Sequence, residues 1–215
     1  MNSVFLDLDG TIMDSEPGIL SSLRHAFREN GHSDLAKSDL KWMIGPPFPN
    51  SFKKAGITDP MPVIESYRVH YMEQGMFNAA VYDGMKAAID RIKALPVRLF
   101  IATAKPNHYA RQITAHFGVA QHMDAEYGPE LDGTRGQKSD LLAYALDQQN
   151  IDPATAIMVG DRTHDFHAAT SNGMASIAVH WGYGSPDEYA NATFQCPDTE
   201  TLPEVIQRWQ QEIAA

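Results

Sequence analysis

The sequence has 215 residues, of which 43% are hydrophobic, so it can form one well-packed domain with a modest insertion. Its formal net charge of −10 argues against a general binder of nucleic acid or of anionic membranes, because both require a basic face. The single cysteine, Cys196, cannot form an internal disulfide and is typical of a reducing compartment. No apolar run approaches the ~18 residues of a membrane span, and Asp7 and Asp9 interrupt the apolar stretch that a signal peptide would need. We therefore expect a cytoplasmic protein.

The first elements in the chain are a strand and a long helical stretch. Residues 4–8 are apolar up to Asp7 and predict a buried strand. A helix is expected over residues 17–30, because Pro17 suits a first turn, Gly31 can end a helix, and apolar residues recur at helical spacing. The chain up to about residue 82 shows further helical segments broken by Gly and Pro, without a strand signal.

After residue 83, helical segments alternate with short apolar segments of strand-like composition. The expected helices cover residues 85–95, 107–117, 139–149, 165–171 and 202–213, and the expected strands cover residues 97–102, 123–126, 156–159 and 175–179. Alternating strands and helices imply βαβ units and a parallel sheet. The predicted fold is therefore α/β, with a Rossmann-like, doubly wound parallel-sheet core of residues 1–14 and 83–215 and an inserted α-helical unit of residues 15–82.

Polar residues follow the expected strands of this core. Asp7 and Asp9 come at the end of the first strand, Thr103 follows the second, and Asp161 follows the strand that begins near residue 156. Lys138 lies just before a helix. Because sites in an open α/β sheet form beyond the carboxyl ends of the strands, these five side chains are expected to converge.

The convergent residue types point to phosphoryl chemistry. Asp7 and Asp9 are expected to share one face of the strand end, where their mutual repulsion requires a cation or a reaction to offset it. Taken alone, the pair could equally form a solvated turn. Together with Asp161, the carboxylates suit a hard cation, above all Mg²⁺, and Asp165, one helical turn later, can lie behind them. A hydroxyl and a lysine suit a phosphoryl group, so the set indicates metal-assisted phosphoryl transfer through an Asp nucleophile.

These motifs resemble the four motifs of the haloacid dehalogenase-like phosphatases, in order and at fitting spacing. The motifs are the Asp-Leu-Asp-Gly-Thr of residues 7–11, Thr103, Lys138 and the Gly-Asp-Arg-Thr-His-Asp of residues 160–165. An insertion between the first two motifs is typical of the subfamily with a helical cap. Further segments resemble the phosphoglycolate phosphatase-like group, namely residues 44–47, 102–106, 172–174 and 181–185.

The resemblance implies a role for each carboxylate. Asp7 attacks phosphorus and becomes a phosphoaspartate, while Asp9 protonates the leaving oxygen and then deprotonates the hydrolytic water. Asp7, the backbone carbonyl of Asp9 and Asp161 hold Mg²⁺. Asp165 completes the metal site through water or from behind the direct ligands.

The resemblance also implies how the phosphoryl group is held. Thr103 and Lys138 contact its oxygens, together with backbone amides near Leu8, Asp9 and Ala104. These contacts would position phosphorus for attack.

The sequence leaves the roles of the other substrate-binding candidates open. Lys105 is either a substrate contact or a surface charge, and Arg162 either contacts substrate or pairs with a neighbouring carboxylate. Gly45, Pro46 and Pro47 form a stiff loop that the resemblance places towards the leaving group.

The predicted protein is an Mg²⁺-dependent phosphomonoester hydrolase acting on a small phosphorylated metabolite, with phosphoglycolate as the first guess. The family pattern usually has Leu at Phe48 and Ser or Asn at Ala104, so a 5′-nucleotidase or a phosphotyrosine-like ester phosphatase stays open. A phosphosugar mutase of the same family, a receiver-like signalling domain and a catalytically silent interaction protein are further alternatives. We expect no nucleic-acid or membrane partner, and a monomer or weak dimer.

Overall fold

The structure is a computed structural model that describes residues 1–214, and it divides into two compact units. The larger unit contains Met1–Met13 and the chain from Val81 onward, and the smaller unit is Asp14–Ala80. The sequence analysis placed the boundaries between the two units after residues 14 and 82. At these boundaries, strands β2 (Met13–Asp14) and β3 (Ala80–Val81) form a two-stranded sheet. The expectation of no strand before residue 82 is therefore wrong at Ala80, because two residues are too few to show a periodic pattern.

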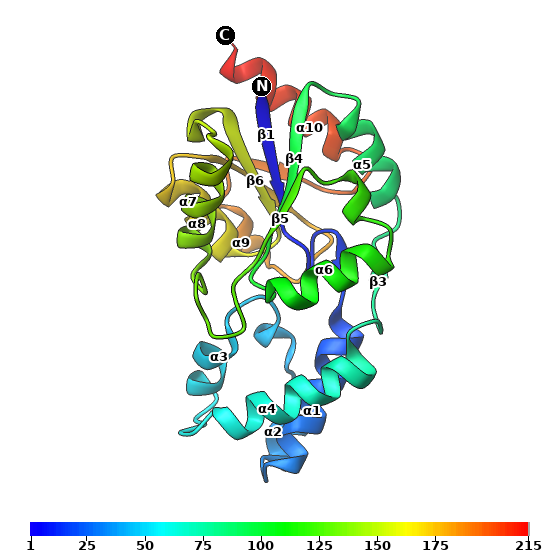
Figure 1. Cartoon of the computed structure of the whole chain (residues 1–215), viewed down its shortest axis with the longest axis vertical. Coiled ribbons are helices and arrows are strands. Elements are labelled where there is room, and N and C mark those ends of the chain that lie inside the picture. The colour runs from blue at the N-terminus through cyan, green and yellow to red at the C-terminus, as the bar shows by residue number, and fades with distance from the viewer. Residues whose placement is uncertain (215) are drawn as a thin grey trace. The chain divides into compact units, whose positions relative to one another are not determined.

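The larger unit is built on a six-stranded sheet in the order β5-β4-β1-β6-β7-β8 (Figure 1). All neighbouring strands pair in parallel. The strands are β1 (Asn2–Leu6), β4 (Val97–Ala102), β5 (Ala125–Tyr127), β6 (Ala156–Gly160), β7 (Ala175–Val179) and β8 (Phe194–Cys196). The predicted fold class is confirmed. Strand β8 was not predicted, since only two of its three residues are buried apolar ones.

Helices cover both faces of this sheet, with α7 and α8 on one side and α5 and α10 on the other (Figure 1). The helices are α5 (Met85–Lys93), α6 (Asn107–His116), α7 (Lys138–Gln149), α8 (Thr163–Ser171), α9 (Pro186–Tyr189) and α10 (Leu202–Ile213), with 3-10 turns η3 (Ala120–His122) and η4 (Pro153–Thr155). Short α9 was not predicted. Within residues 1–214, no helix combines the length and apolar character needed to cross a membrane.

The central strands are apolar along their whole length because both of their faces are covered. Side chains of β1, β4 and β6 are almost entirely buried, and Phe5 stacks on Phe100 with ring centroids 4.9 Å apart. Continuous apolar strands of this kind are typical of parallel sheets. This core fixes the positions at which the strands end.

Strand β1 ends at Leu6, two residues earlier than the sequence suggested. The carbonyl of Leu8 accepts hydrogen bonds from the backbone N–H groups of Ile12 and Met13, so the chain turns directly after the strand. Asp7 and Asp9 therefore lie beyond the end of the strand, where the N–H of Asp7 still donates to the carbonyl of Val159 and Asp9 forms a bridge with Met13. The expectation that strand alternation places the two carboxylates on one face stays a prediction.

The smaller unit is helical apart from the strand residues at its ends. Its elements are α1 (Glu16–Glu29), α2 (Ser33–Lys37), the 3-10 turn η1 (Lys41–Met43), α3 (Phe48–Lys54), α4 (Met61–His70) and the π-helical turn η2 (Tyr71–Gly75). Helix α1 packs on α4, and Phe52 of α3 contacts the ring of Phe27 at 5.5 Å between centroids. Gly45, Pro46 and Pro47 lie between η1 and α3. The unit thus has an apolar core of its own.

We expect Trp209→Ala to destabilise the protein strongly. Trp209 lies on α10, which packs on α5 and β8, and its side chain is 1% exposed. Its removal leaves a large cavity and should lower the free energy of unfolding by about 3–5 kcal/mol, measured by urea denaturation.

The matched control is Ile213→Ala on the same helix, because Ile213 is 42% exposed. Its effect should stay within about 0.5 kcal/mol. Equal effects of the two substitutions would contradict the packing of α10.

Candidate active site

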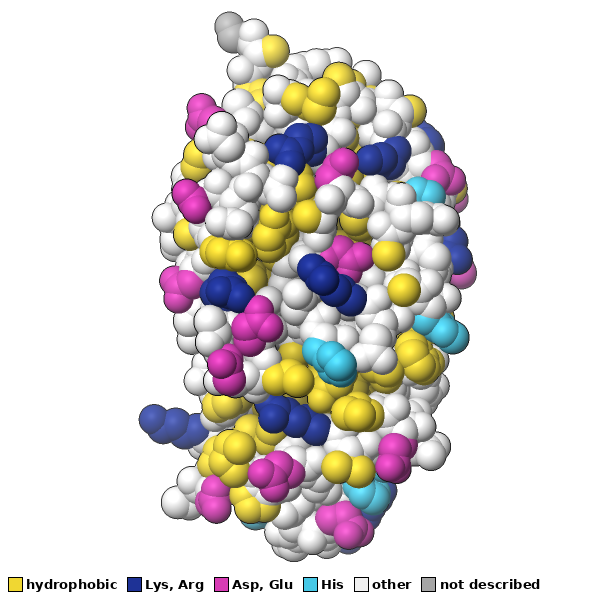
Figure 2. Space-filling view, viewed as in Figure 1, with side chains coloured by type: hydrophobic (Ala, Val, Ile, Leu, Met, Phe, Trp, Pro, Cys, Tyr) yellow, Lys and Arg dark blue, Asp and Glu magenta, His cyan; other side chains and the backbone are white. Residues whose placement is uncertain are grey.

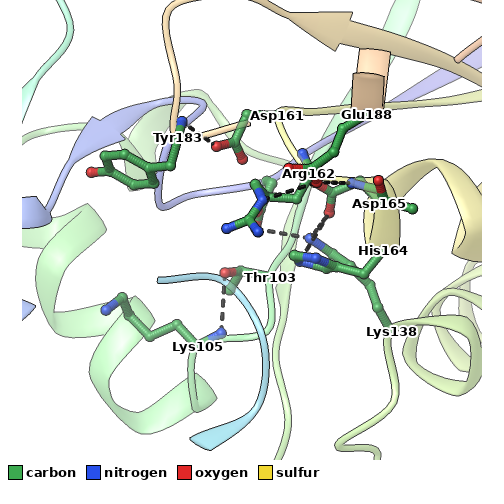
Figure 3. Close-up of polar contacts among 11 residues, drawn as sticks. Thr103, Lys105, Lys138, Asp161, Arg162, His164, Asp165, Tyr183 and Glu188 are labelled. Atoms are coloured by element: carbon green, nitrogen blue, oxygen red, sulfur yellow. Dashed lines mark hydrogen bonds and ion pairs between the residues drawn. The ribbon is translucent and has the colours of Figure 1, made fainter. Parts of the chain in front are cut away.

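A buried lysine bridges two carboxylates at the carboxyl end of the sheet, and Figure 3 shows it with one of them, Asp165. Lys138, the first residue of α7, places its Nζ 2.9 Å from Oδ1 of Asp7 and also pairs with Oδ1 of Asp165. A lysine is unfavourable in the first turn of a helix, where the dipole is positive. Burial opposes its charge, but Asp165 and Asp7 outweigh burial and raise the pKa of Lys138 above its ordinary value. The ammonium is therefore charged at neutral pH.

Burial affects the two carboxylates of this bridge differently. It raises the pKa of Asp7 from 3.8 to about 6, although Lys138 partly offsets the effect. Burial opposes ionisation of Asp165 as well, but Lys138 and the other hydrogen-bond donors hold its pKa below the usual value. Asp165 is thus a permanent anion that orients Lys138, whereas Asp7 is the more reactive carboxylate.

Asp161 is a second buried carboxylate, and it lacks a cationic partner for one oxygen. It directly follows β6, and its Oδ2 accepts a hydrogen bond of 2.6 Å from the backbone N–H of Tyr183. Its Oδ1 is buried and has no hydrogen-bond partner among residues 1–214. Burial, with repulsion from Asp165 and Asp7, raises the pKa of Asp161 well above its ordinary value. A buried acceptor without a partner is energetically unfavourable, and a bound cation would compensate it.

The charges of the site leave room for one divalent cation. When all four motif carboxylates are ionised, they face two ammonium groups, Lys105 and Lys138, so four negative and two positive charges leave a net charge of −2. Arg162 pairs with Glu188, with 3.1 Å between Nε and Oε2, and these two charges cancel. An Mg²⁺ ion would neutralise the remainder. The all-oxygen donor set also suits this ion.

Of the predicted metal ligands, Asp7 and Asp161 each keep a carboxylate oxygen that accepts no hydrogen bond among residues 1–214 and could hold the metal, while the role of the backbone carbonyl of Asp9 stays a prediction. Both oxygens of Asp165 are already engaged, one by Lys138 and the other by the backbone N–H of Arg162 at 3.0 Å. Asp165 therefore lies behind the direct ligands and orients Lys138, which is one of the two roles that the sequence allowed.

A second possible ligand group consists of Asp7, His164 and Asp165, whose candidate ligand atoms lie within 4.8 Å of one another. Lys138 already bridges the two carboxylates of this group. Burial lowers the pKa of His164 to about 4, so the imidazole is neutral at pH 7. The positive charge of Lys138 already compensates the carboxylates of this group, so a further cation is not needed there.

Lys105 forms an ion pair with Asp9. Its Nζ lies 3.0 Å from Oδ2 of Asp9, and the two side chains are only 5% and 11% exposed. Its backbone N–H donates to Oγ1 of Thr103 at 3.2 Å. The sequence left Lys105 open between substrate contact and surface charge, and its burial rules out the surface alternative.

Free donors surround the space beside these carboxylates. Oγ1 of Thr103 accepts the hydrogen bond from Lys105, which leaves the hydroxyl proton of Thr103 for another acceptor. Within the described part of the chain, the backbone N–H groups of Leu8 and Ala104 make no hydrogen bond. These donors match those expected for a phosphoryl group.

The loop of residues 181–184 supports the site, and the sequence did not assign it this role. The indole N–H of Trp181 donates to the carbonyl of Thr11 at 2.9 Å, and Tyr183 donates to Asp161. Gly182 lies so close to Asp161 and to the carbonyl of Gly10 that a Cβ would overlap with both. The Trp-Gly-Tyr-Gly run was the available signal.

The remaining candidates are Arg162 and residues 45–47. The sequence left open whether Arg162 contacts substrate or pairs with a neighbouring carboxylate. Its side chain pairs with Glu188, which also accepts a hydrogen bond of 2.9 Å from the backbone N–H of Thr163. Gly45, Pro46 and Pro47 belong to the smaller unit. Their contact with substrate stays a prediction.

Residues 4–179 match the family model of haloacid dehalogenase-like hydrolases. The chain belongs to the haloacid dehalogenase-like hydrolase family. A solved structure of a predicted phosphatase from Clostridium acetobutylicum has 34% identity and a TM-score of 0.91, covering 96% of this chain and 98% of that one.

Named relatives of this family member differ in activity. A 5′-nucleotidase of Pseudomonas aeruginosa is 34% identical over 95% of both chains. Tyrosine-protein kinase PtkA of Mycobacterium tuberculosis is 38% identical over 86% of this chain, which spans only 64% of that relative's length. Phosphoglycolate phosphatase of Rhodospirillum rubrum is 27% identical over 84% of this chain and 80% of the relative. The predictions of the family and of a phosphatase are confirmed, while the substrate is not decided.

Metal affinity in this hydrolase should fall as the pH is lowered. The proton on Asp7 competes with Mg²⁺, and burial sets the pKa of Asp7 at about 6. The carboxylate is ionised above that pH and protonated below it, and the raised pKa of Asp161 acts in the same direction, so affinity should fall as the pH is lowered through 6, by about tenfold per unit or more. Isothermal titration calorimetry with Mg²⁺ from pH 5 to 8 measures this. Asp147→Asn, an exposed position on α7, serves as control, and a flat profile would contradict the assignment.

Gly182→Ala should weaken Mg²⁺ binding. The added Cβ displaces Asp161, which we assign to the metal, so affinity should fall roughly 10- to 100-fold, as for other residues that support metal ligands. Calorimetry gives the affinity, and circular dichroism verifies folding. The exposed neighbour Ser185, changed to Ala, should retain full affinity. Unchanged affinity in Gly182→Ala would show that the loop does not position Asp161.

Proposed function

We propose that this protein hydrolyses phosphomonoesters of small metabolites through a phosphoaspartate on Asp7, with Mg²⁺ as cofactor. The observation that carries the proposal is the buried Asp7, paired with Lys138 and adjacent to an Asp161 oxygen that lacks a partner. Such a cluster is unfavourable for stability and is typical of a reactive site.

The first step transfers the phosphoryl group to Asp7. A carboxylate oxygen of Asp7 forms a bond to phosphorus while the bond from phosphorus to the ester oxygen breaks, and Asp9 gives its proton to the leaving oxygen. Lys138 and the hydroxyl of Thr103 hold the phosphoryl oxygens. Lys138 is already oriented for this by Asp165.

The second step hydrolyses the intermediate. Asp9, now ionised, takes a proton from water as the water attacks phosphorus, and the bond between phosphorus and Asp7 breaks. Inorganic phosphate leaves and Asp7 regains its carboxylate. Lys105 lies 3.0 Å from Oδ2 of Asp9, the carboxylate that takes this proton.

Asp7, Asp161 and the backbone carbonyl of Asp9 would hold Mg²⁺. When bound, the ion offsets the repulsion between the carboxylate nucleophile and the phosphate dianion. Asp161 is well suited to this role because the 181–184 loop fixes one oxygen and leaves the other available.

The substrate proposal keeps phosphoglycolate first and a nucleoside 5′-monophosphate second. The second candidate is favoured by the 34% identity to a 5′-nucleotidase over 95% of both chains. We propose that the smaller unit acts as a cap and selects the leaving group. On the face in Figure 2, acidic and basic side chains are interspersed, which supports a small-molecule substrate over nucleic acid.

Phosphate release from a panel of monoesters tests the function. The panel contains phosphoglycolate, nucleoside 5′-monophosphates, phosphotyrosine and hexose phosphates, each with Mg²⁺ and with a chelator. We expect Mg²⁺-dependent release, and a loss in Asp7→Asn on the order of 10³-fold or more, because the nucleophile is removed.

The matched control is Asp147→Asn, since Asp147 is exposed on α7 outside the cluster. It should retain wild-type rates. Full activity in Asp7→Asn would disprove the nucleophile, and isomerisation of hexose phosphates faster than their hydrolysis would establish a mutase instead.

A further inference from the structure

Glu188 of the short helix α9 holds the turn that follows Asp161. Its Oε2 lies 3.1 Å from Nε of Arg162 and accepts a hydrogen bond of 2.9 Å from the backbone N–H of Thr163. Thr163 is the first residue of α8, and Asp165 lies in the first turn of that helix. One carboxylate oxygen thus contacts both residues that come directly after Asp161.

Asp165 holds the same turn at a neighbouring backbone group. Its Oδ2 accepts the N–H of Arg162 at 3.0 Å, and its Oδ1 pairs with Lys138. The turn is therefore bound by two carboxylates, the fully buried Asp165 and Glu188, whose side chain is 23% exposed. Both carboxylates bind backbone N–H groups, so they restrict the path of the chain between Asp161 and Asp165.

The first turn of α8 is a favourable place for a negative charge. The first N–H groups of a helix have no partner within it, and the helix dipole is positive at this end. Burial opposes ionisation of Glu188, but the N–H of Thr163 and the guanidinium of Arg162 hold the pKa of Glu188 below its usual value. Glu188 is therefore an anion at neutral pH, bound to the turn by charge-assisted hydrogen bonds.

The segment that leads to Glu188 also contacts Asp161 itself. The backbone N–H of Tyr183 donates to Oδ2 of Asp161 at 2.6 Å, and a Cβ at Gly184 would overlap with the backbone carbonyl of Asp161. The hydroxyl of Tyr189 donates to the carbonyl of Gly184 at 2.8 Å, which ties the segment to α9. The segment therefore holds Asp161 at one end and the turn after Asp161 at the other.

We propose that Glu188 is a positioning residue for the metal site, because it fixes the orientation in which Oδ1 of Asp161 is available to Mg²⁺. That oxygen is buried and has no hydrogen-bond partner among residues 1–214. In this role Glu188 binds neither metal nor substrate, and it acts through the backbone of the turn and the N–H of Tyr183. The inference rests on the proposed function only in taking Asp161 as a metal ligand.

The Mg²⁺ affinity of two variants at this position tests the proposal. Glu188→Ala removes both contacts with the turn and should weaken Mg²⁺ binding about tenfold, as for other residues that support metal ligands. Glu188→Gln keeps a neutral oxygen that can accept the N–H of Thr163, so its loss should be smaller. Isothermal titration calorimetry gives the affinity, and circular dichroism verifies folding.

Asp187→Ala is the matched control, because it removes the same charge from the exposed neighbour on α9. It should keep the wild-type affinity. Unchanged affinity in folded Glu188→Ala would overturn the proposal. An equal loss in Asp187→Ala would also overturn it, since the effect would then come from the net charge alone.

The amide proton resonance of Tyr183 gives a second readout that needs no metal. A short hydrogen bond to a carboxylate deshields an amide proton, so displacement of Asp161 in Glu188→Ala should move this resonance upfield, whereas Asp187→Ala should not. If Glu188 contributed only to stability, the unfolding temperature would fall while the resonance and the affinity stayed unchanged, which would overturn the proposal. Should Glu188→Ala not fold, the same two readouts in Glu188→Gln decide, and wild-type values of both would overturn the proposal.

These measurements separate the inference from the proposed function, because neither of them requires turnover. A wild-type protein that binds Mg²⁺ but hydrolyses no phosphomonoester would reject only the hydrolysis. A wild-type protein that binds no Mg²⁺ would reject the metal assignment and, with it, the role of Glu188 in metal binding.

Discussion

The ion-pair bridge from Asp7 through Lys138 to Asp165 is the interaction on which the site depends. Three charged side chains lie in the protein interior, each almost completely buried. Removing one partner of a buried ion pair leaves an uncompensated charge, which is strongly destabilising. The sheet supplies Asp7, α7 supplies Lys138 and α8 supplies Asp165, so the bridge also ties three segments of the core together.

The bridge satisfies only part of the negative charge at this edge of the sheet. Asp161 keeps an unpartnered oxygen, and burial raises the pKa of both Asp161 and Asp7. The protein therefore keeps an arrangement that opposes stability where a metal and a phosphoryl group would be favourable. Sites that break local rules of stability in this way are commonly functional.

Membership of this family does not by itself determine a substrate. The motif residues lie in the larger unit and account for the family membership. Relatives that share the family are named a 5′-nucleotidase, a tyrosine-protein kinase and a phosphoglycolate phosphatase. A shared fold is compatible with several substrates, because specificity is set by individual residues around a common site.

The sequence by itself determined the α/β core, the helical insertion and the polar residues that follow Leu6, Ala102 and Gly160. Buried parallel strands and amphipathic helices have strong local patterns, and parallel strands place their carboxyl ends along one edge. Short elements such as β8 and α9 were missed, because three or four residues carry too little pattern.

Only the tertiary structure decided which charges meet. The pairs Lys105 with Asp9 and Arg162 with Glu188 join residues far apart in the chain. The early end of β1 and the hydrogen bond from Tyr183 to Asp161 likewise depend on how loops pack against one another. Side-chain contacts of this kind are set by the burial and close packing of the whole core. Local sequence therefore identified the candidate residues of the site, and packing determined their partners.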